Sequence, residues 1–204
     1  MGTRHLICIV LDGEYKLAQY GQWDGYLEGQ GTVIAKTLQA DDFDLDALKR
    51  GARAAEVISY DVKKKVYREE FGVDLDVTDG IVPFEVSAAF RRKYEHLTRS
   101  HGAQVVRYLM TAANPQVQEP YLEFANDGLF CEWAYVLDLD REVVEVYRGF
   151  QKEPPAEDER FAKADQEPND GGYYPVQLVA EATFTEFTSD YLYALSEKLD
   201  PDDE

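Results

Sequence analysis

The densest group of residues that could bind a ligand lies at positions 19–31, in the run Gln-Tyr-Gly-Gln-Trp-Asp-Gly-Tyr-Leu-Glu-Gly-Gln-Gly. Its four glycines permit positive φ angles and a close approach of ligand to backbone, and its aromatic rings offer flat apolar faces. Polar side chains between the rings could orient a ligand by hydrogen bonds. We therefore predict a ligand-binding loop that uses Tyr20, Gln22, Trp23, Asp24, Tyr26, Gly29 and Gly31.

The same composition also fits a sharp crossover, in which glycines relieve steric clashes and Trp23 fills the core. If Thr32 begins a helix, the free N–H groups at its start would add an anion-binding end beside the loop. The spacing of a phosphate-binding loop is absent from this run. Ligand binding and a purely steric role both remain open at this point.

Other constellations that could do chemistry are sparse. The chain has three histidines, His5, His96 and His101, and no Cys or His pair has zinc-ligand spacing. Asp138 and Asp140 could hold a hard cation, although acids of a solvated turn have the same spacing. No Ser–His–Asp grouping is evident, so we expect neither a metal nor a cofactor.

Several longer runs resemble a family of bacterial, phage and fungal proteins. They are Met-Gly-Thr-Arg-His-Leu-Ile-Cys at the start, Leu-Asp-Gly-Glu-Tyr-Lys at 11–16 and Gln-Tyr-Gly-Gln-Trp-Asp-Gly-Tyr at 19–26. Glu-Trp-Ala-Tyr-Val-Leu-Asp-Leu-Asp at 132–140 and Val-Tyr-Arg-Gly at 146–149 fit the same family. The resemblance covers about a fifth of the chain and implies no activity.

The chain start is also distantly similar to the N-terminal-nucleophile hydrolases, in which Thr, Ser or Cys opens the first strand of an αββα sandwich. Thr3 stands in that position, and Gly2-Thr3 matches the dipeptide at which proteasome β subunits cleave themselves. The resemblance implies an amidohydrolase in which released Thr3 is the nucleophile and its own α-amine the base. Arg4 would lie beside this site and is added to the predicted ligand-binding residues.

Length, composition and charge limit the class of protein. With 204 residues, 45% of them hydrophobic, the chain fits a single domain, 1–204, with a substantial core. The formal net charge of −19 would repel nucleic acid, and a short basic run at Lys63–Lys65 is too small to reverse that field. Such an acidic surface suits solubility or a basic protein partner.

The two cysteines and the hydropathy indicate a compartment. Cys8 and Cys131 lie in apolar runs typical of buried, reduced thiols, and no apolar run approaches the length of a membrane span. We therefore expect a soluble cytoplasmic protein that contacts no membrane. Its oligomeric state is left open.

The first half of the chain predicts a hairpin followed by helices. Apolar residues at 5–11, the dipeptide Asp12-Gly13 and an alternating run at 14–20 indicate two strands joined by a type I′ turn, with Tyr15 and Leu17 on one face. A short helix or strand is expected at 32–39. It precedes a helix at 44–60, capped by Asp44 or Asp46, and a second helix at 62–71, with a break in the chain near residue 80. One long helix at 84–113, or two broken at 100–102, follows.

The second half predicts mainly sheet, with strands at 121–124, 131–139, 143–148 and 175–187. An acidic, proline-containing excursion loop at 153–172 interrupts it, and a helix at 188–198 leads to a frayed acidic tail at 200–204. The fold expected is an α/β layered sandwich of mainly antiparallel sheet, resembling the N-terminal-nucleophile fold. Helices from 44–113 would cover a sheet built from both chain ends.

These observations leave three functions open. The first is a domain that binds a small molecule or a protein partner through the 19–31 loop. The second is an amidohydrolase that uses Thr3 after cleavage between Gly2 and Thr3. The third is an acidic interaction protein that engages a basic partner.

Overall fold

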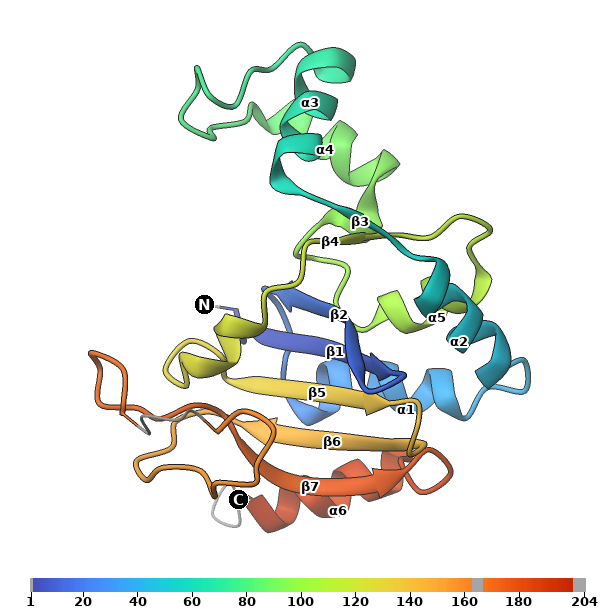
Figure 1. The fold of residues 1–204 in the computed structure, drawn as a ribbon, viewed down its shortest axis with the longest axis vertical. Helices are drawn as coiled ribbons and strands as arrows, with labels where there is room; N and C mark the ends of the chain where they lie inside the picture. Colours follow the sequence, from blue (N-terminus) through green and yellow to red (C-terminus); the bar gives the residue numbers. More distant parts are fainter. Residues whose placement is uncertain (1, 163–166, 200–204) are drawn as a thin grey trace.

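The computed structural model describes residues 2–162 and 167–199, so the predicted tail at 200–204 lies outside the described residues. Five strands form the central sheet: β1 (His5–Leu11), β2 (Glu14–Gly21), β5 (Trp133–Asp138), β6 (Val143–Arg148) and β7 (Gln177–Thr183). Their order is β2-β1-β5-β6-β7 (Figure 1), with β1 and β5 parallel and the other neighbours antiparallel. The α/β class and the mainly antiparallel sheet are confirmed.

The first hairpin forms as its turn residues predict, but one face assignment is wrong. Asp12 and Gly13 have φ angles of 58° and 72°, which a type I′ turn requires. The pairing of β1 with β2 skips Lys16, because Ile9 pairs with Leu17 while Val10 pairs with Tyr15. This β-bulge turns Tyr15 to the face opposite Leu17, although simple alternation places both on one face.

Four helices cover one face of the sheet: α1 (Thr32–Leu38), α2 (Leu45–Ala54), α5 (Gln104–Thr111) and α6 (Ser189–Leu199). Alternation along β1 directs Ile7, Ile9 and Leu11 into this layer. The predicted cap of α2 is confirmed, since the Asp44 carboxylate accepts the N–H of Ala47 at 2.8 Å. Within the described residues no helix is long and apolar enough to cross a membrane.

The opposite face is covered without a second sheet. A 3₁₀ helix, η3 (Leu122–Asn126), lies there together with Phe161 and Val176 of the segments 150–162 and 167–176, so the strand predicted at 121–124 is wrong. The predicted excursion loop contributes Phe161 to the apolar core and Arg160 to an ion cluster with Asp138 and Glu145. An αββα arrangement needs a second stacked sheet, which the described residues do not place on this face.

Residues 56–100 form an arm that extends beyond the β2 edge of the sheet (Figure 1). The arm contains β3 (Glu56–Ile58), α3 (Tyr60–Phe71), α4 (Phe84–Lys93) and a 3₁₀ helix, η2 (Glu95–Leu97). It has a separate apolar cluster, in which the Tyr67 and Phe90 rings stack 4.4 Å apart. β3 pairs in parallel with β4 (Gln116–Gln118), which returns the chain to the sheet.

The arm corrects two helix predictions. The helix predicted at 44–60 ends at Ala54, because Ala55 is extended with ψ 123° and Ser59 caps a new helix by accepting from Val62. The helix predicted at 84–113 is broken, as one alternative allowed, and Gly102 has a φ of 52° inside the break. Only α2 and α5 of the region 44–113 therefore pack on the sheet.

Candidate functional site

The 19–31 loop begins as strand and ends as helix. β2 continues to Gly21, and residues Leu27–Gly31 form a π-helix, η1, that leads directly into α1. Trp23 is 47% exposed, so it does not fill the core. The Thr32 N–H donates to the Leu27 and Gly29 carbonyls, and the anion-binding helix start predicted there is therefore occupied by the loop itself.

The glycines of the loop have steric roles. A Cβ at Gly29 would collide with the carbonyl of Asp24, and the N–H of Gln30 donates to that same carbonyl at 2.8 Å. A Cβ at Gly31 would press on the hydroxyl of Tyr135. The steric alternative from the sequence thus accounts for these two glycines, while the exposed rings of Trp23 and Tyr26 remain accessible to a partner.

The chain start lies against this loop, as the sequence hypothesis requires. Gly25 donates its N–H to the Thr3 carbonyl at 2.9 Å, and Gly2 packs directly against the Trp23 ring. Arg4 turns the other way: its guanidinium lies over the Phe130 ring, 4.4 Å from the centroid, and its Nε is 3.7 Å from Glu132. Thr3 therefore contacts the loop through its backbone carbonyl.

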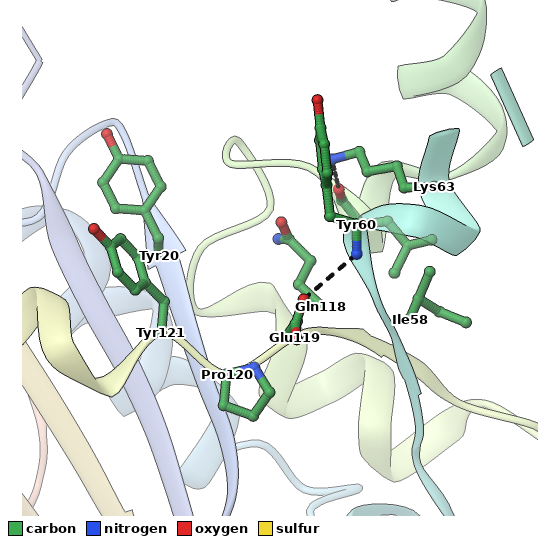
Figure 2. Close-up of a pocket in the computed structure, with 9 residues that line it drawn as sticks. Tyr20, Ile58, Tyr60, Lys63, Gln118, Glu119, Pro120 and Tyr121 are labelled. Atoms are coloured by element: carbon green, nitrogen blue, oxygen red, sulfur yellow. Dashed lines mark hydrogen bonds between the residues drawn. The ribbon is translucent and has the colours of Figure 1, made fainter. Parts of the chain in front are cut away.

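A cleft of about 430 Å³ opens where the loop leaves β2, between the sheet edge and the arm (Figure 2). Of the residues predicted to bind a ligand, Tyr20 alone lines it. The sequence missed the others because they come from three segments that are far apart in the chain, and no local motif marks them. The cleft is lined by Tyr20, Ile58, Tyr60, Lys63, Leu97, Gln118, Glu119, Pro120 and Tyr121.

One wall of the cleft is aromatic. Tyr20 and Tyr121 lie side by side there (Figure 2). Both rings pack on Phe124 of η3, at centroid distances of 4.9 and 5.7 Å respectively, which fixes their orientation. The Tyr20 hydroxyl donates to the Gln22 Oε1 at 2.5 Å, so a second predicted residue supports the wall from behind.

The opposite wall comes from the base of the arm. Ile58 pairs with Gln118 across β3 and β4, and the Glu119 carboxylate accepts the backbone N–H of Tyr60 at 3.4 Å. Ser59 caps α3 and thereby directs Lys63, one turn further on, toward the cleft. Figure 2 shows Tyr60 and Lys63 facing the two tyrosines across the opening.

The cleft contains polar groups from Lys63, Gln118 and Tyr20. The Lys63 ammonium donates to the Leu97 carbonyl at 3.1 Å, and burial together with the nearby Arg99 charge lowers the pKa of Lys63. The Gln118 Nε2 is buried with no hydrogen-bond partner among the described residues. Burial raises the pKa of Tyr20, so its hydroxyl stays protonated at neutral pH.

The acidic candidates from the sequence have structural partners, and the two buried histidines are neutral. Asp138 accepts from Arg160 at 3.0 Å, and Asp140 accepts the N–H groups of Asp12 and Gly13 at the hairpin turn. Burial lowers the pKa of both His5 and His101 to about 4, so both are neutral at pH 7. Within residues 2–162 and 167–199, no group of three His, Cys, Asp or Glu side chains is placed to hold a metal.

Cys8 and Cys131 are both free and buried in the core on the η3 side of the sheet, where burial raises their thiol pKa values. Comparison of the chain with protein-family models, with curated proteins and with solved structures found no match.

Proposed function

We propose that this protein binds a small molecule in the cleft between the β2 edge and the arm, with the first residues of the 19–31 loop as one wall. The observation that carries the proposal is the cleft itself, because its volume of about 430 Å³ lies in the range typical of ligand pockets. Apolar and aromatic side chains make most of its lining, and only a few polar groups converge on it. That balance is typical of small-molecule sites.

The tyrosines explain how a flat ligand would be held. Tyr20 and Tyr121 are braced by Phe124, so little side-chain entropy is lost when a ligand packs on them. Tyr60, more than half exposed on the opposite wall, would close over the second face of the ligand. Bound in this way, a planar group buries apolar area on both sides.

Only the first residues of the 19–31 loop take part in the proposed ligand binding. Tyr20 contacts the ligand, and Gln22 holds the Tyr20 hydroxyl. Trp23, Asp24 and Tyr26 lie beyond the cleft lining, next to the chain start. A protein partner on that exposed part of the loop is the competing form of the same hypothesis.

Binding of naphthalenemethanol, a neutral flat probe, tests the proposal. Two-dimensional amide NMR should show saturable shifts at Tyr20, Ile58 and Tyr121, and Tyr121→Ala should weaken binding about threefold to tenfold through lost ring packing. Tyr193→Ala is the matched control, since Tyr193 is an exposed tyrosine on α6.

The exposed part of the loop is tested in the same titration with Trp23→Ala. This variant should bind the probe as the wild type does and should melt at nearly the same temperature, because Trp23 is 47% exposed. Probe shifts confined to residues 23–26, and abolished by Trp23→Ala, would place the site on the loop instead. Absence of saturable shifts at the cleft would refute the proposal.

A further inference from the structure

The charge of the cleft differs from that of the molecule around it. The arm holds eight of the 21 Lys and Arg residues but only nine of the 40 Asp and Glu residues, so it is nearly neutral on a chain of net charge −19. The lining of the cleft includes one arm cation, Lys63, and Arg99 lies close enough to lower its pKa. The arm side of this opening therefore carries little of the acid excess of the protein.

Lys63 and Arg99 lack the carboxylate partners that several other arm cations have. Lys64, Arg68 and Lys93 each form an ion pair with an arm carboxylate at 3.1 Å or less. In the described part of the chain, neither Lys63 nor Arg99 has such a partner within 4.0 Å. Two cations near one another with no carboxylate at ion-pair distance, at an opening of low polarity, favour an anion there.

Two side chains of the cleft lining have donors without an acceptor. An ammonium group carries three N–H donors, and the Lys63 ammonium uses one of them on the Leu97 carbonyl. The Gln118 Nε2 is buried without an acceptor, which is costly unless a ligand supplies one. Glu119, the carboxylate in the lining, is turned to the Tyr60 N–H.

From these contacts we infer that the ligand is an organic carboxylate attached to a planar apolar group, with its carboxylate oxygens on Lys63 and Gln118 and its flat part between the tyrosines. This inference rests on the proposed binding function and adds the chemical class. We assign a carboxylate rather than a phosphate because the lining offers one point charge, Lys63, to the anion and contains no Arg fork that would add further charge-assisted bonds. An apolar cation is rejected by Lys63 and Arg99.

Three probes of the same shape test the inference by isothermal titration: naphthoate, naphthalenemethanol and naphthylmethylammonium. Wild-type protein should bind naphthoate about tenfold more tightly than the alcohol, and the ammonium probe most weakly, because a charge-assisted hydrogen bond is added or a repulsion introduced. Lys63→Met keeps the apolar stem and should bring naphthoate to the affinity of the alcohol. Lys65→Met removes the same charge from the exposed side of α3 and should preserve the tenfold preference.

The outcomes separate the two proposals. Equal binding of naphthoate and the alcohol in the wild type would overturn the carboxylate inference while leaving the cleft as a binding site, whereas no binding of any probe would overturn both. If the preference survives in the Lys63→Met, Arg99→Gln double variant, the anion binds elsewhere and the inference is wrong. Should Lys63→Met fail to fold by circular dichroism, Arg99→Gln alone decides, with an expected loss of naphthoate affinity of about threefold.

Discussion

Replacement of His5 by Gln should make the stability of this protein less sensitive to acid. His5 is buried at the start of β1, with its ring against Gly21 of β2, and burial lowers its pKa from 6.5 to about 4. Because the folded pKa lies below the unfolded one, the unfolded chain binds the proton more readily between these two values. The contribution of His5 to the stability is therefore fully present above about pH 6.5 and is lost as the pH falls toward 4.

The size of this effect follows from the two pKa values. A histidine whose pKa is 6.5 in the unfolded chain and about 4 in the folded protein lowers the unfolding free energy by roughly 2 kcal/mol between about pH 7 and pH 5. His101, which is also buried with a pKa of about 4, adds a similar loss. The ion-paired carboxylates titrate below this window, since their pKa values are lowered.

Urea unfolding followed by tryptophan fluorescence at about pH 7, 6 and 5 measures the effect. The loss of unfolding free energy over this range should be smaller by about 2 kcal/mol in His5→Gln than in the wild type, whatever the stability of the variant at pH 7. Tyr135→Phe is the control: it removes a buried hydrogen bond to the Gly25 carbonyl but no group that titrates here. An unchanged pH dependence in His5→Gln would refute the argument from burial.

Two further predictions concern the ion cluster and the chain start. Arg160→Met should lower the unfolding free energy measured in urea by about 3 kcal/mol, because Glu145 and Asp138 would lose their shared cation in a buried setting. Arg141→Met, at the exposed end of the cluster, should lower it by less than about 1 kcal/mol. Equal losses in the two variants would contradict this account. For the hydrolase hypothesis, intact mass spectrometry of the purified protein should show loss of Met1 and Gly2 if Thr3 is released as a nucleophile, and a mass that retains Gly2 argues against it.

The sequence identified residues of the cleft only where short-range interactions determine the backbone conformation. Tyr20 lies near the end of β2, whose turn and length the sequence predicts, and Gln22 directly follows β2; both support one wall of the cleft. Lys63 lies in a basic run that in sequence looks like an exposed helix face. It faces the cleft because Ser59 begins α3 at that point, and because β4 brings Gln118 beside Ile58 from sixty residues away.

Local chemistry also explains which elements the sequence determined. The Asp12-Gly13 turn and the Asp44 cap depend on backbone conformations and hydrogen bonds within a few residues, so the residue types suffice to predict them. The bulge that turns Tyr15 to the other face depends on how β2 fits a partner strand. The docking of Arg160 depends on two acids brought together by the pairing of β5 with β6.

The sequence by itself therefore determined the α/β class, the first hairpin, most helices and the position of the 19–31 loop. Tertiary structure alone decided that the loop's glycines relieve clashes, that the acidic excursion anchors on the sheet, and that an arm stands beside β2. The physical reason is the separation along the sequence between the residues that make these contacts. A cleft between the arm and the sheet edge is made by contacts between segments distant in the chain, and neither periodicity nor residue spacing records those contacts.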